Sequence, residues 1–203
     1  MAFFLVDTFT EASDTALQSH TPDVGGTWSK HPDYPGGVTV NSAGGYAEGD
    51  SPTVTGIYTN SAVPSSADYY VEAELRNSAQ EISCGVVGRA SSAIGNFYYV
   101  FRGNNGVVLA KFVNGVYIQL GRFEYDVGVT SVPVRLVMDG SIISVLVDGV
   151  EVISLTDTSF SSAGVVGIGL RAGLRVDNLV AGTLGATFNP AWAQGSNAII
   201  GVN

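Results

Sequence analysis

Positive charge is scarce in this sequence. Only nine of the 203 residues are Lys or Arg, against 18 acidic residues, so the net charge is −9. Lysine occurs only at Lys30 and Lys111. Because nucleic acids and anionic membranes are bound through clustered cations, we expect neither as a partner. Long apolar runs are also missing, since no stretch approaches the roughly 18–20 apolar residues of a membrane span.

Cysteine is nearly absent as well. The single Cys84 excludes an intrachain disulfide framework, and its position in a strand-like run predicts a buried structural thiol. A thiol nucleophile would need a nearby histidine, and only His20 and His31 exist. Residues 1–7 have no basic segment and only a very short apolar run, so they do not resemble a signal peptide. We therefore expect synthesis in the cytoplasm of a host cell, and we predict no cofactor.

Glycine and valine dominate what is present. Glycine contributes 26 residues and charged residues only 13%, about half the usual ~25%. This composition is typical of pleated strands joined by tight turns, and turn signals recur about every 8–12 residues. We predict an all-β fold, a two-sheet antiparallel jelly-roll sandwich, with at most one turn of helix at 11–18. The short strands expected outside the two segments described next are 3–10, 27–30, 38–40, 45–48, 53–58, 164–171 and 175–181.

Two segments give the clearest strand pattern. In 68–76 apolar and polar residues alternate, which predicts a strand with one buried face. The residues expected to face inward are Tyr69, Val71, Ala73 and Leu75. In 96–155 Asn-Gly and Asp-Gly pairs separate the apolar runs, and such pairs favour the backbone of two-residue hairpins. We therefore predict that 96–155 forms an antiparallel meander.

The C-terminal residues 183–203 break this pattern. They carry no charged side chain and include Phe188, Trp192, Ile199 and Ile200. A disordered tail is normally polar and charged, and so apolar a tail left in water would promote aggregation. We therefore predict a jelly-roll domain over 1–182 and a tail, 183–203, packed on its own domain or on a neighbouring chain. The four large apolar residues would make the assembly contact, in a homo-oligomer (a trimer favoured) or with a different protein.

The order of motifs resembles a known group of domains. Between 134 and 179 the sequence runs strand, Asp-Gly, strand, Asp-Gly, then Gly-Val-Val-Gly and Val-Asp-Asn. This order resembles the second half of a concanavalin A-like jelly roll of the laminin-G-like group. Residues 7–28, with Asp-Thr-Phe-Thr and Gly-Gly-Thr-Trp, resemble the opening of such domains in bacteriophage structural proteins. Residues 189–197 resemble the end of phage virion proteins.

The resemblance covers nearly the whole chain and implies a function as well as a fold. We interpret the protein as a non-enzymatic phage virion structural protein, either a capsid decoration or a tail- or fibre-associated subunit. Its place would be the virion surface, and its partners other virion proteins. The alternative is a carbohydrate-binding module or adhesin that recognises host-surface glycans. Because this fold hosts lectins, hydrolases and scaffolds alike, the two interpretations can coexist.

Candidate catalytic residues are few. No nucleophile elbow, zinc-protease motif, P-loop or Cys-x-x-Cys occurs. Glu72 and Glu74 would lie about 6.5–7 Å apart on one strand face, within the range of glycosidase carboxylates, but opposite the apolar face. We interpret that face as solvated. Glu124 and Asp126 match only part of a three-acid glycosidase pattern, because Val129 stands in the third position. We predict that the protein is not an enzyme.

Asp7 and Asp177 are the candidate metal ligands of this sequence. Asp7 shares a strand face with apolar residues, and Asp177 would be its neighbour if the first and last strands pair. Two such carboxylates would favour Ca²⁺, although an arginine or backbone N–H groups could satisfy both instead, so we predict no metal. His20 lies in a turn-rich segment near Asp23, which we expect to be a hydrogen-bonded loop anchor.

Glycan binding would need exposed aromatic rings beside amide or carboxylate groups. The sequence does not show which rings converge, and most are expected to be half-buried strand residues. We therefore name no individual ligand-binding residue, and the glycan-binding residues stay unknown at this stage. The aromatic candidates are Trp28, Tyr34, Tyr46, Tyr58, Tyr70, Tyr98 and Tyr117.

Overall fold

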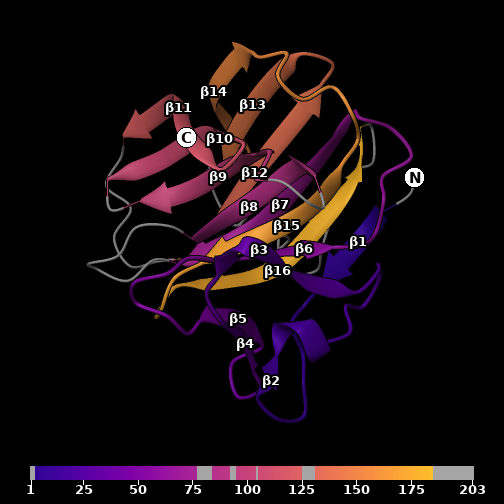
Figure 1. The fold of residues 1–203 in the computed structure, drawn as a ribbon, viewed down its shortest axis with the longest axis vertical. Coiled ribbons are helices and arrows are strands. Elements are labelled where there is room, and N and C mark those ends of the chain that lie inside the picture. Colours follow the sequence, from indigo (N-terminus) through magenta and orange to yellow (C-terminus); the bar gives the residue numbers. More distant parts are fainter. Residues whose placement is uncertain (1–2, 77–83, 92–94, 104, 125–130, 185–203) are drawn as a thin grey trace, which may run out of the picture.

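Two antiparallel sheets stack face to face in a computed structural model of the chain (Figure 1). The structure describes residues 3–76, 84–91, 95–103, 105–124 and 131–184. The predicted two-sheet sandwich is confirmed. In place of the helical turn expected at 11–18, a single 3-10 turn, η1, spans Leu17–Ser19. No helix in the described ranges has the length and apolar character needed to cross a membrane.

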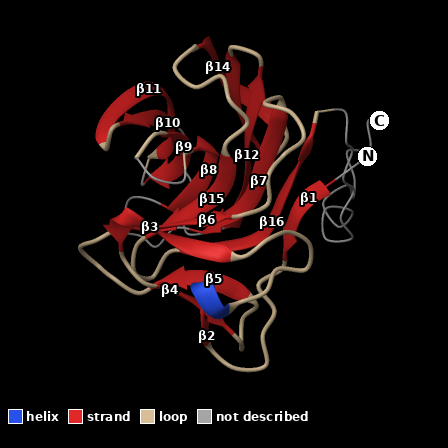
Figure 2. Ribbon diagram, turned by 45° about the vertical axis from the view of Figure 1, so that its right-hand side comes forward, coloured by secondary structure: helices blue, strands red, loops and turns tan. Residues whose placement is uncertain are grey.

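The larger sheet has nine strands and contains both ends of the described chain. Figure 2 shows this sheet reaching from β14 to the small strands beside η1. Its strands, in spatial order, are β14 (Val150–Thr156), β13 (Ile142–Val147), β12 (Ser131–Asp139), β7 (Tyr69–Arg76), β16 (Arg175–Thr183), β5 (Tyr46–Gly49), β4 (Val38–Asn41) and β2 (Thr15–Ala16). The ninth strand, β1 (Phe3–Asp7), pairs antiparallel with β16.

The smaller sheet has seven strands. In spatial order they are β11 (Val116–Glu124), β10 (Gly106–Val113), β9 (Phe97–Gly103), β8 (Cys84–Ala90), β15 (Val165–Leu170), β6 (Gly56–Asn60) and β3 (Trp28–Pro35). Its two edges are therefore β11 and β3. Side chains from both sheets form one apolar core, with Val100 of β9 and Leu136 of β12 among its fully buried members.

The alternation predicted for 68–76 is confirmed in β7. Its residues Tyr69, Val71, Ala73 and Leu75 are completely buried in the core between the sheets. The alternate residues face the other way, where Arg76 is exposed. Burial of four apolar side chains from one strand fixes its register, because a one-residue slip would turn all four to the opposite face.

The meander predicted for 96–155 is wrong as a single unit. Strands β9, β10 and β11 belong to the seven-stranded sheet, whereas β12, β13 and β14 belong to the nine-stranded sheet. The hairpins themselves are correct: Asn114 and Gly115 have φ angles of 52° and 78°, and Asp148 and Gly149 have 49° and 77°. Turn chemistry specifies a local hairpin, but it carries no information about which sheet the hairpin joins.

Candidate functional site: an aromatic groove

A second apolar cluster lies outside the core, on the outer face of the seven-stranded sheet. Along β9, Tyr98 and Val100 point into the core. Phe97, Tyr99 and Phe101 point outward, yet they are only 0%, 3% and 9% exposed. An outer sheet face that is buried this well must be covered by another part of the chain.

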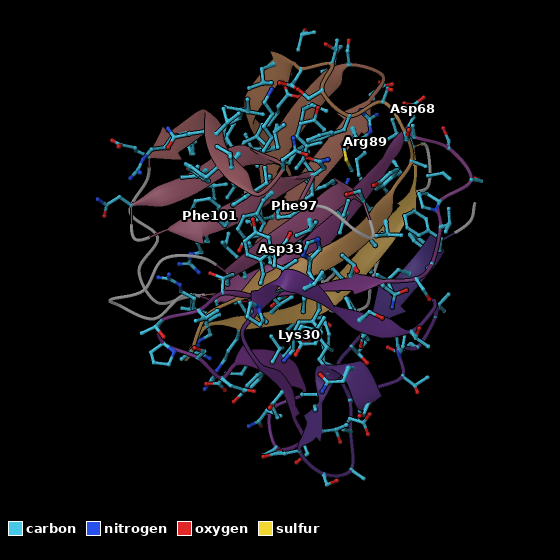
Figure 3. All side chains as sticks on the ribbon, in the orientation of Figure 1. Lys30, Asp33, Asp68, Arg89, Phe97 and Phe101 are labelled. Atoms are coloured by element: carbon cyan, nitrogen blue, oxygen red, sulfur yellow. The ribbon has the colours of Figure 1, made fainter. Side chains whose placement is uncertain are left out.

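A bulge in β3 supplies the cover. The pairing of β3 with β6 is interrupted between Lys30 and Pro35, which frees the segment 31–34 from the sheet edge. The ring of Tyr34 lies 5.6 Å from that of Phe97 and 5.5 Å from that of Phe112. In a flat sheet, β3 and β10 would be about 24 Å apart at ~4.8 Å per strand. The bulge in β3 and the curvature of the sheet together bring Tyr34 over the outer face; we call the segment 31–34 the arch, and Figure 3 labels its Asp33 and, on β9, Phe97.

Next to this arch is a pocket of about 140 Å³ that we call the aromatic pocket. It is lined by Tyr34, Thr55, Ile57, Tyr99, Phe101, Phe112 and Tyr117. The rings of Tyr34 and Tyr117 stand at 83° and 71° to the ring of Phe112, at centroid distances of 5.5 and 5.6 Å. The two tyrosines thus form walls beside a phenylalanine, and Tyr117 is 46% exposed.

A second pocket of about 320 Å³ adjoins it and shares Phe101 and Tyr117; we call it the polar pocket. Its remaining lining residues are Gly103, Asn105, Gly106, Val108, Gln119 and Arg122. Arg122 Nε lies 3.1 Å from a carboxylate oxygen of Glu124, in an exposed ion pair. We refer to the two adjoining pockets together as the aromatic groove.

Both wall tyrosines are protonated at neutral pH. Burial, with a contribution from the charge of Asp33, raises the pKa of Tyr34 to about 12. Burial also raises the pKa of Tyr117, an effect that the positive charge of Arg122 reduces. Each therefore has a neutral hydroxyl; that of Tyr117 donates to Gln119 at 3.4 Å, and that of Tyr34 can donate to a ligand.

The groove contains two of the aromatic candidates from the sequence, Tyr34 and Tyr117. The other candidates lie elsewhere. Trp28, Tyr58 and Tyr98 are core residues. Tyr46 and Tyr70 lie under arginines on the nine-stranded sheet, with guanidinium-to-ring distances of 4.2 and 4.5 Å.

Sequence reasoning missed the polar lining and three aromatic residues of the groove: Tyr99, Phe101 and Phe112. The available signal was the unbroken apolar and aromatic run 97–101. A strand with apolar side chains on both faces must be covered on both.

The candidate acids are not arranged as a catalytic pair. Glu72 and Glu74 both lie on β7, outside the groove. Arg135 Nε donates to Glu72 at 2.7 Å, and the Ser131 hydroxyl donates to Glu74 at 3.0 Å. The expected solvated face is thus half-buried and hydrogen-bonded. Cys84 is fully buried, as predicted, and burial raises its pKa to about 12.

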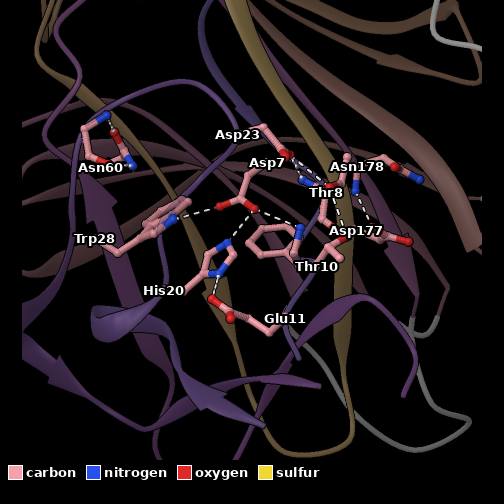
Figure 4. Close-up of polar contacts among 12 residues, drawn as sticks. Asp7, Thr8, Thr10, Glu11, His20, Asp23, Trp28, Asn60, Asp177 and Asn178 are labelled. Carbon is pink, nitrogen blue, oxygen red and sulfur yellow. Dashed lines mark hydrogen bonds and ion pairs between the residues drawn. The ribbon is translucent and has the colours of Figure 1, made fainter. Parts of the chain in front are cut away.

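Asp23 is not the hydrogen-bond partner of His20, although the two residues lie close in the sequence. The ring nitrogens of His20 lie 2.8 Å from Asp7 and 2.7 Å from Glu11 (Figure 4). Asp23 instead accepts hydrogen bonds from the backbone and side chain of Thr8. His20 is still a buried loop anchor, but its partners are carboxylates on the chain before it.

The calcium hypothesis does not fit the environment of Asp7. Strands β1 and β16 pair as expected, and Asp7 is completely buried. Both of its oxygens accept N–H donors, however: the indole of Trp28 at 2.8 Å, His20, and the backbone N–H of Phe9 at 2.8 Å. These hydrogen bonds stabilise the buried carboxylate, so it does not need a bound cation to offset its burial. No group of three or more metal-ligating side chains occurs among the residues described.

The predicted assembly residues Phe188, Trp192, Ile199 and Ile200 lie outside the described residues. The boundary at 182 falls one residue before the end of β16 at Thr183.

No protein-family model and no curated protein sequence matches this chain. Solved structures share its fold. The carbohydrate-binding module CBM66 from Bacillus subtilis has a TM-score of 0.60 at 17% identity, covering 84% of this chain and 96% of that one. The exoplasmic/lumenal domain of VIP36 in its Ca²⁺/Man-bound form has a TM-score of 0.62 at 11% identity, covering 94% and 93%. At these identities the likeness shows the fold, a jelly-roll sandwich of the concanavalin A-like type.

Proposed function

We propose that the protein is a carbohydrate-binding module that holds a saccharide in the aromatic groove. The observation that carries this proposal is the juxtaposition of aromatic ring walls with Gln119 and Arg122 in one depression. Aromatic surface packs on the C–H face of a sugar, whereas amide and guanidinium groups bond its hydroxyls. A mostly apolar lining with a few placed polar groups is the usual make-up of a small-molecule site.

The comparisons support this proposal without naming a ligand for this chain. One structural relative is titled a carbohydrate-binding module, and another is titled a Man-bound form. Both extend over more than four fifths of this chain. The binding function is therefore better supported than a purely structural role.

We infer that binding is not accompanied by cleavage. Glycoside hydrolysis uses a pair of carboxyl groups flanking the scissile bond. Among the described residues that line the groove, none is a carboxylate. Glu124 lies nearby but is ion-paired with Arg122.

A glycan array with the protein and three variants tests the proposal. Tyr117→Ala removes a wall of both pockets, and Gln119→Ala removes an amide from the polar pocket. Tyr46→Ala is the matched control, because this ring lies on the nine-stranded sheet against Arg175. We expect selective binding that the first two variants weaken about tenfold, while the control retains it.

If Tyr46→Ala lost binding while Tyr117→Ala kept it, the binding site would lie on the nine-stranded sheet and not in the aromatic groove. An array without a single selective ligand would reject the carbohydrate-binding function itself.

We further propose that the module works on the surface of a phage particle, as a decoration or as a tail- or fibre-associated subunit. The support is the resemblance of 7–28 and 189–197 to phage structural proteins, together with the apolar composition of 183–203. Quantitative mass spectrometry of purified particles tests this proposal. A fixed copy number per particle is expected, and absence from intact particles would reject it.

A further inference from the structure

The two pockets of the groove differ in size. The polar pocket, at about 320 Å³, falls within the roughly 300–1,000 Å³ range of sites that enclose a small molecule. The aromatic pocket, at about 140 Å³, is well below it. If a sugar ring occupies the polar pocket, the smaller aromatic pocket beside it is open to a substituent of that ring.

The polar atoms around the aromatic pocket are mostly engaged already. The Tyr99 hydroxyl donates to the carbonyl of Gly169 at 3.1 Å. The Thr55 hydroxyl accepts from Arg171 at 3.3 Å, and the Tyr117 hydroxyl donates to Gln119 at 3.4 Å. A sugar hydroxyl placed here would lose its water and find few partners, which is costly.

The Tyr34 hydroxyl, a neutral donor, makes no hydrogen bond within the described part of the chain, and the Thr55 hydroxyl keeps its own proton to donate. Hydroxyl donors beside three or more aromatic rings suit a substituent that has an acceptor and an apolar end. An acetamido group has this chemistry, because its carbonyl accepts one hydrogen bond and its methyl group packs on rings.

We infer that the saccharide bound by this groove carries a 2-acetamido group, whose methyl end enters the aromatic pocket while the sugar ring lies in the polar pocket. This inference rests on the proposed carbohydrate-binding function and adds the ligand class. The Tyr34 wall and the shared Tyr117 then act as specificity residues that separate acetamido sugars from their hydroxyl counterparts.

Two matched pairs of probes test the inference by calorimetric titration. Tri-N-acetylchitotriose and cellotriose differ only in the 2-substituent of each ring, as do N-acetylgalactosamine and galactose. We expect the acetamido member of at least one pair to bind about fourfold or more tightly than its partner, the gain expected for burying one methyl group.

A variant that fills the pocket sharpens the test. Thr55→Leu adds apolar volume to the lining of the aromatic pocket and leaves the polar pocket unchanged. We expect it to reduce the affinity for the acetamido probe to that for the hydroxyl probe. Thr53→Leu is the matched control, because Thr53 is exposed two residues earlier and lines neither pocket. We expect this control to preserve the preference.

Equal affinity within both pairs, or no binding of any of the four probes, overturns the inference. If the glycan array nevertheless shows selective ligands without acetamido groups, the proposed function stands and only the ligand class is wrong. A preference that survives Thr55→Leu also overturns the inference, because the substituent would then lie outside the aromatic pocket.

Discussion

At the scale of single residues, His20 is a buried group held between two acids. Each of its ring nitrogens lies within hydrogen-bond distance of a carboxylate oxygen, on Asp7 and on Glu11. When both ring nitrogens donate to these carboxylate oxygens, the ring carries a positive charge. Burial opposes this charge, but the hydrogen bonds and charges of the two acids outweigh it and raise the pKa of His20 above 6.5.

This arrangement predicts a pH-dependent stability. A histidine whose pKa is higher in the folded state than in the unfolded state stabilises the fold fully below the unfolded pKa, about 6.5. The stabilisation is lost as pH rises through the raised pKa. We expect Glu11→Gln to lower the pKa of His20 and to reduce the free energy of unfolding at pH 6 by about 1 kcal/mol.

NMR titration of the His20 ring, together with urea unfolding of both proteins at several pH values, checks this. The stability difference should shrink above the raised pKa. A difference that stays constant from pH 6 to pH 9 would show that Glu11 acts by packing rather than through the charge of His20.

The burial of Asp177 leads to a second prediction, that stability depends on pH in a range below that of His20. Burial raises its pKa to about 6, against an opposing hydrogen bond from the backbone N–H of Asn178, and the nearby charges of Glu74 and Asp7 add to the rise. Because the folded state holds this proton more tightly than the unfolded state does, stability falls as pH rises from about 4 to 6. We expect Asp177→Asn to remove this fall, which amounts to about 1–2 kcal/mol after solvent screening.

Urea unfolding at pH 4 and pH 6 measures the effect of Asp177→Asn. The variant should be as stable as the parent near pH 4 and more stable near pH 6. Identical pH profiles for the two proteins would mean that Asp177 ionises freely in the fold.

At the scale of elements, the arch in β3 covers part of the outer face of the seven-stranded sheet. Tyr34 contacts the rings of His31, Phe97 and Phe112, whereas Tyr117 has a ring contact only with Phe112 in the described part of the chain. We expect Tyr34→Ala to lower the free energy of unfolding by about 2 kcal/mol and Tyr117→Ala by about 0.5 kcal/mol. Chemical denaturation of the two variants gives the comparison, and equal losses would contradict the covering role of the arch.

The contacts of the arch could not be predicted from the sequence, whereas other parts of the fold could. The strand β7 and the hairpin turns at Asn114 and Asp148 follow from local alternation and turn chemistry, and the structure has them where they were expected. The contact of Tyr34 with Phe97 and Phe112 joins positions more than 60 residues apart. No local period marks such a contact, so the fold class was predictable and the groove was not.

At the scale of the whole molecule, assembly remains the prediction made from the apolar segment 183–203. We expect deletion of 188–203 to leave a folded sandwich that no longer self-associates, because Phe188, Trp192, Ile199 and Ile200 are lost. Burial of Trp192 alone is worth about 4 kcal/mol at ~25 cal/mol per Å². Size-exclusion chromatography with light scattering compares the two chains. A full-length protein that is already a monodisperse monomer would reject self-association.

The central claim is that the aromatic groove is the surface through which the protein binds carbohydrate. The most direct measurement is an NMR titration of the full chain with its tightest glycan-array ligand, following each backbone amide. We predict that the shifts concentrate in β9, β10, β11 and the segment 31–34, around Tyr34, Phe101 and Tyr117. Shifts confined to the outer face of the nine-stranded sheet, or no shifts at saturating ligand, would contradict it.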